Sequence, residues 1–253
     1  MPATFTKRRV PAQPGSIPDQ LQMFVREVRF YREIAPTVGV RVPACGRAEE
    51  QDGSTLLELE DLSSWRLGAD PVDAAQTLAQ LHLRWEGTAL GEWPWLPKVD
   101  VSHLVERLYA QAWPSVCRRF ELTPRLREMG DGLVGQVSAA EQRAEASGPH
   151  TLVHGDPAAR NIRTSPTGEV ALLDWEDLGA GPGVCDLAWF LVSSVRPADW
   201  NRTIAAYGGA EGLAEALPAA MVQGVLSIPL DEEKSSAARQ RIERLDEGAR
   251  RTR

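Results

Sequence analysis

The chain has 253 residues, of which 43% are hydrophobic and 25% charged, a composition typical of a soluble globular protein with a sizeable core. Its net charge of -7 argues against a nucleic-acid-binding protein, which usually carries a basic excess. The three cysteines are far apart in the sequence and form no C-x-x-C pair, which argues against a disulfide framework and a zinc site.

The apolar segments of the chain are short. The N-terminal segment has basic residues but no apolar stretch after them, which is not the pattern of a signal peptide. The longest apolar run, around residues 186–195, is too short to span a bilayer. We therefore expect a cytoplasmic protein with no membrane partner and no nucleic-acid partner. The sequence leaves the oligomeric state open.

The first 61 residues predict a small unit of strands and one helix. Residues 4–10, TFTKRRV, alternate enough to form a short strand, and a proline-rich loop follows. Residues 20–35 repeat apolar side chains with helical spacing, and Asp19 is the expected N-cap. A turn signal then precedes a buried strand at Thr55–Glu60.

From residue 62 onward the pattern becomes mostly helical. Asp70 and Pro71 stand in N-cap and N1 positions of a helix that should end at Gly87. Further helical patterns cover residues 101–111, 115–120, 124–146, 184–195, 198–207 and 212–227. Three short strands are expected at Thr151–Val153, Asn161–Thr164 and Val170–Leu173. The charged tail, residues 231–253, shows no apolar stripe and predicts a solvated helix or a frayed end.

The stretch TLVHGDPAARNI, residues 151–162, carries the clearest chemical pattern. Its His154, Asp156 and Asn161 match the spacing H-x-D-x-x-x-x-N, which places a base and a metal ligand in kinases. Asp174 follows Asn161 by 13 residues, after a hairpin that would fold it back toward Asn161. The alternative is a polar turn between two strands. The flanking strands and the hairpin favour a site for phosphoryl transfer.

At these residues the sequence resembles the aminoglycoside phosphotransferase family, one of the protein-kinase-like small-molecule kinases that also include choline kinases. The resemblance rests on LVHGDPAARNI, VALLDWED and GPGVCDLAWFL, and extends upstream through LAQLHLRW, LLELEDL, FVREVRFYREI and FTKRR. It implies an α+β, protein-kinase-like two-lobed fold. Residues 1–61 would form the nucleotide-binding lobe, and residues 62–253 the mostly helical catalytic and substrate-binding lobe.

The resemblance also implies roles for the residues of the central motif. Asp156 would be the catalytic base, while Asn161 and Asp174 would be the ligands of Mg²⁺. The ring of His154 would hydrogen-bond the backbone of the motif rather than move protons. Glu176, two residues after Asp174, could contact the metal or a cationic substrate.

Lys7 and Glu27 fit the nucleotide-binding pair of kinase-like folds, in which a strand lysine holds phosphates and a helix glutamate orients it. Glu33 competes for the role of Glu27, and Glu27 could instead pair with Arg26 on the surface. The resemblance further assigns the segment LLELEDL to the hinge, where backbone groups from Glu58 to Glu60 would face the adenine. A plain buried strand would have the same composition.

One feature departs from the family pattern. The family would place two strands and a phosphate-covering loop before the lysine strand, yet this chain begins almost on that strand. We therefore expect a truncated small lobe.

The expected function is an ATP- or GTP-dependent, Mg²⁺-requiring transfer of the γ-phosphoryl group to a hydroxyl of a small molecule such as an aminoglycoside or choline. The alternatives are a nucleotide- or ligand-binding pseudokinase, without turnover because its small lobe is incomplete, and a metal-dependent phosphohydrolase. Trp93, Trp95 and Trp113 could stack on the acceptor, although tryptophans are more often packing residues.

Overall fold

The computed structural model describes residues 3–97, 99–228 and 236–252. The chain forms two compact units, one of residues 1–99 with 151–180 and the other of residues 100–150 with 181–253. The boundaries of these units differ from those of the predicted lobes, because segment 151–180 packs with residues among the first 61. The division into lobes at residue 61 stays a prediction. Within the described residues, no helix combines the length and the apolar character needed to cross a bilayer.

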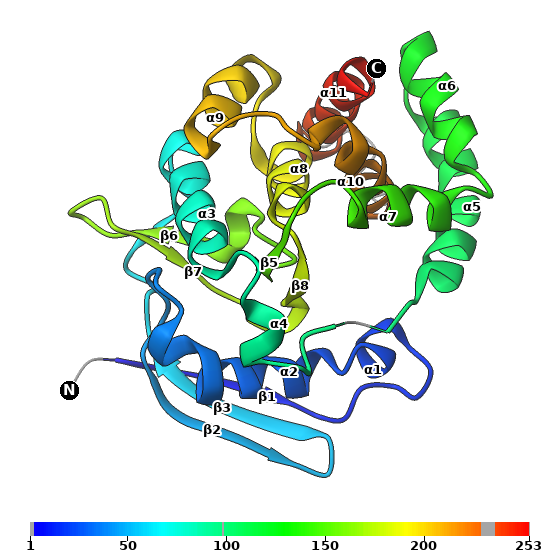
Figure 1. Cartoon of the computed structure of the whole chain (residues 1–253). Helices are drawn as coiled ribbons and strands as arrows, with labels where there is room; N and C mark the ends of the chain where they lie inside the picture. The colour runs from blue at the N-terminus through cyan, green and yellow to red at the C-terminus, as the bar shows by residue number, and fades with distance from the viewer. Residues whose placement is uncertain (1–2, 98, 229–235, 253) are drawn as a thin grey trace. The chain divides into compact units, whose positions relative to one another are not determined.

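The first unit contains an antiparallel sheet in the order β1-β3-β2, built from Thr4–Arg9, Cys45–Gln51 and Ser54–Glu60 (Figure 1). The strands β1 and β3 confirm the sequence prediction, whereas β2 was not predicted. The central strand β3 buries Leu57 and Leu59 on one face. Because Lys7 lies opposite Leu57 in the register, the Lys7 side chain projects from that same face.

The predicted helix over residues 20–35 is wrong as one continuous element. The chain forms α1 (Ile17–Gln20) and α2 (Met23–Arg29), followed by a π-helical turn, η1 (Phe30–Ile34), and a 3₁₀ turn, η2 (Ala35–Thr37). Ser16, rather than Asp19, is the N-cap of α1. Gln22 breaks the helix because its φ of 52° lies in the left-handed region.

The remainder of the first unit carries the motif. Its helices are α3 (Pro71–Trp85) and α4 (Ala89–Glu92). Asp70 is the N-cap of α3, as predicted, since its carboxylate accepts a 2.9 Å hydrogen bond from Val72 N. The strands of this part are β4 (Arg66–Leu67), β6 (Ile162–Thr164) and β7 (Val170–Leu172), together with all but the first residue of β5 (His150–Val153) and the first two residues of β8 (Gly179–Pro182). They form a sheet β4-β6-β7 and a pair β5-β8.

The second unit is helical over its described residues. It comprises α5 (Ser102–Arg119), α6 (Pro124–Leu133), α7 (Val137–Glu145), α8 (Gly183–Ser194), η5 (Pro197–Asp199), α9 (Trp200–Tyr207), α10 (Leu213–Leu226) and α11 (Ser236–Arg251). Two helical patterns were predicted around Pro114, but the helix continues through this residue. The predicted helix 124–146 is broken near Gly135, whose φ is 75°.

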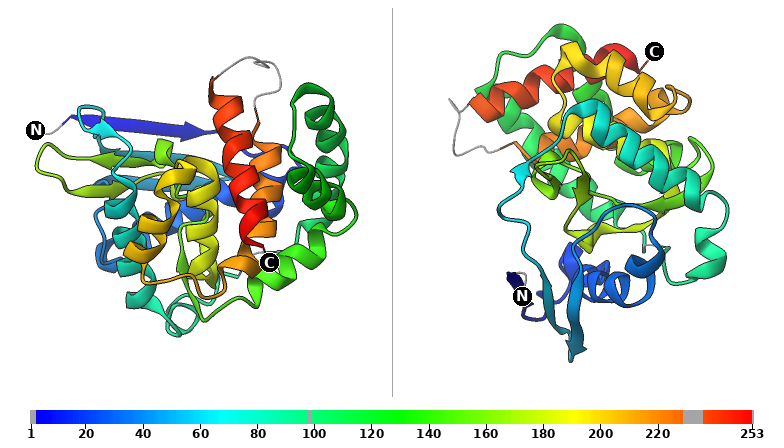
Figure 2. Two further views of the ribbon diagram at one scale, coloured as in Figure 1. Left: turned by 90° about the horizontal axis from the view of Figure 1, so that it is seen from above. Right: turned by 90° about the vertical axis from the view of Figure 1, so that its left-hand side faces the viewer.

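The helix α11 corrects the expectation of a solvated or frayed tail. Ala238, Leu245 and Ala249 are buried, and α11 packs against α10 and α8 of the same unit (Figure 2). Arg241 and Arg244 also donate hydrogen bonds to the carbonyl oxygens of residues 192 and 193, at the C-terminal end of α8. Residues 231–235 and 253 of the predicted tail lie outside the described residues.

Docking of α11 predicts a large effect of Leu245→Ala. Leu245 is fully buried, so its truncation should lower the free energy of unfolding by about 2–5 kcal/mol. Equilibrium denaturation in urea measures this change. Glu243→Ala is the matched control, since Glu243 is exposed on the same helix and should change stability by about 0.5 kcal/mol or less. Equal effects of the two substitutions would contradict the docked helix.

The second unit also predicts a pH dependence of stability. Burial, with the nearby charges of Asp100 and Glu106, raises the pKa of Glu141 from 4.5 to about 7. The stability that protonated Glu141 contributes to the folded state is therefore fully present below pH 4.5. It is lost as the pH rises through 7, because the buried carboxyl group then has to ionise. Glu141→Gln should unfold like the wild type at pH 4.5 and be more stable by about 1–3 kcal/mol at pH 8. Denaturation at both values tests this, with exposed Glu128→Gln as the control.

Candidate active site

The loop after β5 is held by the ring of His154, which is fully buried. The ring Nδ1 accepts a 3.2 Å hydrogen bond from Asp156 N, so this nitrogen carries no proton. The Nε2 atom therefore donates to the carbonyl oxygen of Leu173, 2.9 Å away. Both ring nitrogens contact backbone, which is the arrangement expected for His154 from the sequence.

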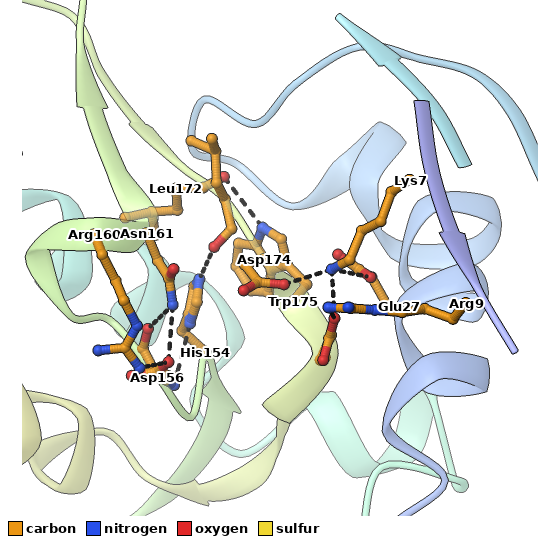
Figure 3. Close-up of polar contacts among 12 residues, drawn as sticks. Lys7, Arg9, Glu27, His154, Asp156, Arg160, Asn161, Leu172, Asp174 and Trp175 are labelled. Carbon is orange, nitrogen blue, oxygen red and sulfur yellow. Dashed lines mark hydrogen bonds and ion pairs between the residues drawn. The ribbon is translucent and has the colours of Figure 1, made fainter. Parts of the chain in front are cut away.

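The carboxylate of Asp156 is oriented by side chains from the following 3₁₀ turn, η3 (Ala159–Asn161) (Figure 3). Its Oδ2 atom accepts hydrogen bonds from Arg160, at 2.5 Å, and from Asn161 Nδ2, at 2.9 Å. The same Asn161 amide nitrogen donates to the Asp156 carbonyl at 2.9 Å. Because the nitrogen is used in this way, the amide oxygen of Asn161 is turned away from Asp156.

The hairpin β6–β7 brings Asp174 to the same region of the unit. Ile162 pairs with Leu172 in the antiparallel ladder, and Leu173 N donates to the Asn161 carbonyl at 2.8 Å. The next residue, Asp174, has a φ of 63°. A non-glycine residue in the left-handed region is uncommon and often marks a functional turn. The backbone of Asn161 is thus tied to the residue that precedes Asp174.

Lys7 lies among three carboxylates (Figure 3). Its Nζ atom is 2.7 Å from Glu27, 2.6 Å from Asp174 and 2.5 Å from Glu176. The predicted pairing of Lys7 with Glu27 is therefore present. Glu33 does not compete for Lys7, because it forms an ion pair with Arg29 at 3.0 Å.

The three carboxylates keep the Lys7 ammonium charged. Burial alone would lower the pKa of Lys7, but Glu27 and Asp174 raise it overall. For Asp174, burial would raise the pKa, and the Lys7 ammonium lowers it overall. Glu27 is the most deeply buried of the three, and desolvation raises its pKa to about 7 despite the ion pair.

Arg9 joins this cluster and was not predicted from the sequence. Its guanidinium lies 2.5 Å from Glu176 Oε1, the same oxygen that contacts Lys7. Arg9 stands two residues after Lys7 on β1, so both side chains leave the same face of the strand. The alternation of side chains along the predicted strand could have placed Arg9 beside Lys7. In the sequence, however, Arg9 was read only as part of the basic run KRR.

A column of aromatic rings connects η1 with the turn after Asp174 and with the loop that carries His154. Phe30 of η1 stacks on Trp175, with ring centroids 4.1 Å apart and planes at 10°. Trp175 belongs to η4 (Trp175–Asp177), directly after Asp174, and also contacts the His154 ring at 4.4 Å. The position of Asp174 therefore depends on the packing of Phe30, Trp175 and His154.

Glu58 and Glu60 lie on β3, and the structure does not bring their side chains to Lys7. Glu60 pairs with Arg41, and its backbone N–H donates to Ala44 O at 2.7 Å. Since side chains alternate along a strand, Glu58 and Glu60 project from the face opposite that of Leu57 and Lys7. An adenine contact by this segment would have to use backbone groups and stays a prediction.

The tryptophans singled out in the sequence are packing residues. Trp113 is 3% exposed and Trp93 is 8% exposed, and Trp93 packs edge-on against Trp85. Trp95 carries the guanidinium of Arg29 at 4.0 Å from its ring centroid and donates its indole N–H to Glu33. These contacts occupy the rings that were considered for stacking on an acceptor.

The side chains predicted to bind Mg²⁺ have suitable donor atoms for a hard divalent cation. Asp174 has a carboxylate and Asn161 an amide oxygen, which are donors that Mg²⁺ prefers, and their role as ligands stays a prediction. Among the described histidine, cysteine, aspartate and glutamate side chains, one cluster is compact enough for a metal, namely Glu27, Asp174 and Glu176, with ligand atoms within 4.8 Å of one another. The Lys7 ammonium contacts all three of them, so a cation bound there would compete with it.

Comparison with solved structures supports a kinase-like fold. The choline kinase LicA from Streptococcus pneumoniae superposes with a TM-score of 0.55 at 15% identity, over 98% of this chain and 85% of that one. Spectinomycin phosphotransferase APH(9)-Ia, in complex with ADP and spectinomycin, gives 0.54 at 11% identity over 97% and 81%. Macrolide 2′-phosphotransferase MphH from Brachybacterium faecium gives 0.50 at 20% identity over 95% and 84%. The predicted α+β, protein-kinase-like fold is confirmed.

The family assignment comes from the sequence. A search of curated protein sequences found no match. The family model described as "Phosphotransferase enzyme family" matches residues 13–221, which is most of the chain and includes the segment from His154 to Glu176. This chain therefore belongs to the phosphotransferase enzyme family.

Proposed function

We propose that the chain transfers the γ-phosphoryl group of ATP or GTP to a hydroxyl of a small molecule, with an aspartate base and Mg²⁺. The observation that carries the proposal is a pair of contacts: Asp156 with Asn161 on the loop after β5, and Asp174, after β7, with Lys7 of β1. Both pairs lie in one compact unit. They supply a base, oxygen ligands for a cation and a cationic side chain, which are the parts that phosphoryl transfer requires.

In this proposal Asp156 is the general base. Its carboxylate takes the proton of the acceptor hydroxyl as the acceptor oxygen bonds to the γ-phosphorus and the bond from that phosphorus to the β–γ bridging oxygen breaks. Asn161 holds the carboxylate in place through its amide nitrogen. The nucleoside diphosphate then leaves with the bridging oxygen.

The nucleotide would be held by Lys7, oriented by Glu27. The ammonium contacts Glu27 at 2.7 Å and Asp174 at 2.6 Å, so its contact with Glu27 would remain if the Asp174 carboxylate turned to a bound cation. Asn161 and Asp174 would hold Mg²⁺, which neutralises charge on the phosphates when bound. Glu176 is a further oxygen donor near Asp174, and Arg9 limits the negative charge that Glu176 adds there.

Support for the proposed acceptor class comes from the solved structures similar to this chain and not from a pocket in the structure. The solved relatives include a choline kinase and phosphotransferases for spectinomycin and macrolides. We propose an acceptor of that general kind, a small hydroxylated molecule such as an aminoglycoside or choline.

The test is acceptor-dependent formation of ADP or GDP in the presence of Mg²⁺. Spectinomycin, gentamicin, streptomycin, a macrolide and choline form the first panel of acceptors. We expect at least one member to raise nucleotide turnover above the rate with water alone, and EDTA to remove that increase. Nucleotide binding without turnover on a wider panel of hydroxyl compounds would instead favour a pseudokinase. Turnover that persists without a divalent cation would contradict the proposed role of Mg²⁺.

A further inference from the structure

Arg26, next to Glu27 on α2, is unusual because its charged side chain is buried and forms no ion pair with the described residues, Asp177 being the nearby carboxylate that acts on it electrostatically. It is 8% exposed, and its three hydrogen bonds all go to backbone carbonyl oxygens. The acceptors are Leu21 O at 2.9 Å, Leu96 O at 2.9 Å and Pro97 O at 2.6 Å. A surface ion pair of Arg26 with Glu27, considered from the sequence, is not what the structure shows for either residue.

These bonds connect three parts of the first unit. Leu21 lies at the break before α2, while Leu96 and Pro97 belong to the segment that follows α4. Leu96 is fully buried, and Trp95 beside it lies with its ring 5.7 Å from the Arg26 guanidinium. One guanidinium therefore fastens α2 to the chain before it and to residues 95–97.

The helix needs such an anchor because its own ends are weak. It spans only seven residues, and its N-cap, Gln22, is left-handed and makes no side-chain capping bond. A helix this short is marginal without tertiary contacts. At its other end the chain passes into the π-helical turn that carries Phe30.

Anchoring Arg26 also determines where Glu27 points. Consecutive residues project about 100° apart around an α-helix. With Arg26 directed to the carbonyls of residues 96 and 97, Glu27 is directed to Lys7, and rotation of the helix would displace both contacts. We propose that Arg26 is a positioning residue that sets the rotation of α2 and so places Glu27 against Lys7 for nucleotide binding. The proposal rests on the proposed function of Lys7.

The experiment measures ATP binding in the presence of Mg²⁺ by calorimetry, which requires no acceptor. Arg26→Gln removes the charge and two of the carbonyl bonds, and should raise the Kd for ATP about tenfold or more. Arg26→Lys retains the charge but cannot reach three carbonyls together, so an intermediate loss is expected. Arg29→Gln on the same helix is the control: the Arg29 guanidinium contacts exposed Glu33 and the ring of Trp95 but none of the carbonyl oxygens that Arg26 binds, so the Kd should stay unchanged.

A double-mutant cycle separates positioning from a general loss of stability. If Arg26 acts through Glu27, the effect of Arg26→Gln on the Kd should largely disappear in a Glu27→Gln background, while its effect on the unfolding midpoint should persist. Additive effects of the two substitutions on the Kd would overturn the proposal. So would a Kd in Arg26→Gln equal to that in Arg29→Gln.

Hydrogen exchange distinguishes failure of the inference from failure of the proposed function. If the wild-type chain binds no ATP, the proposed role of Lys7 in nucleotide binding is wrong. The positioning of α2 by Arg26 is then tested by the hydrogen-exchange rates of the backbone amides of residues 27–30 alone. Faster exchange there in Arg26→Gln than in Arg29→Gln supports control of α2 by Arg26. Equal exchange in the two variants contradicts it.

Discussion

Asp156→Asn should lower kcat for phosphoryl transfer by about 10²–10⁴-fold, the contribution typical of a general base. The substitution is nearly isosteric, and the new amide oxygen can still accept the hydrogen bond from Asn161 Nδ2. Folding should therefore be retained. The nucleotide contacts proposed for Lys7 and Asp174 are made by other elements, so the Kd for ATP should stay close to that of the wild type. Steady-state kinetics and calorimetry measure the two quantities.

Arg160→Gln is the matched control for Asp156→Asn. Arg160 donates to the same carboxylate oxygen, Oδ2, but its side chain is largely exposed, and its removal leaves the carboxylate and the Asn161 bond in place. We expect a fall in kcat of about tenfold or less, since an exposed ion pair contributes little. If kcat of Asp156→Asn equalled that of the wild type, the proposed role of Asp156 as the general base would be wrong.

The central motif could be predicted from the sequence because its parts are local. The strands around it were predicted to within one or two residues, and the ring of His154 contacts backbone as expected. A hairpin of this length has few ways to return the chain, so the approach of Asp174 to Asn161 follows from the spacing. The pairing of Lys7 with Glu27 was reached through resemblance, across 20 residues of intervening chain.

Other features depend on contacts that local patterns do not carry. The apolar spacing runs on through Gln22, and the sequence therefore did not reveal the break that makes α2 a short helix. The burial of Arg26 depends on Leu96 and Pro97, about 70 residues away. In the tail, Leu245 is one of few apolar residues among charges, and only packing against α8 and α10 shows its role.

Gly155→Ala is the substitution in the motif expected to lower stability most, because Gly155 lies in a tertiary contact that no local sequence pattern shows. Gly155 has a φ of 84°, and a Cβ atom there would lie 1.9 Å from the carbonyl oxygen of Asp177. The backbone of the loop that carries His154 and Gly155 therefore lies directly against the backbone of the turn after Asp174. Moving either backbone to make room for a Cβ atom would cost considerable free energy. We expect a loss of about 3–5 kcal/mol, measured by urea denaturation. The kcat of the remaining folded protein should also fall, because separating these backbones moves Asp156 relative to Asp174.

Gly168→Ala provides the control that isolates the close approach. Gly168 has a similar φ of 92° in the turn of the β6–β7 hairpin, yet a Cβ atom added there would meet no atom within 4 Å. Its replacement should incur only the backbone cost of a left-handed alanine, roughly 1–2 kcal/mol, and should leave kcat unchanged. The difference between the two variants then measures the contact between the loops. If both substitutions lower stability equally and neither lowers kcat, the backbone contact at Gly155 does not position Asp156 and Asp174 for the proposed reaction.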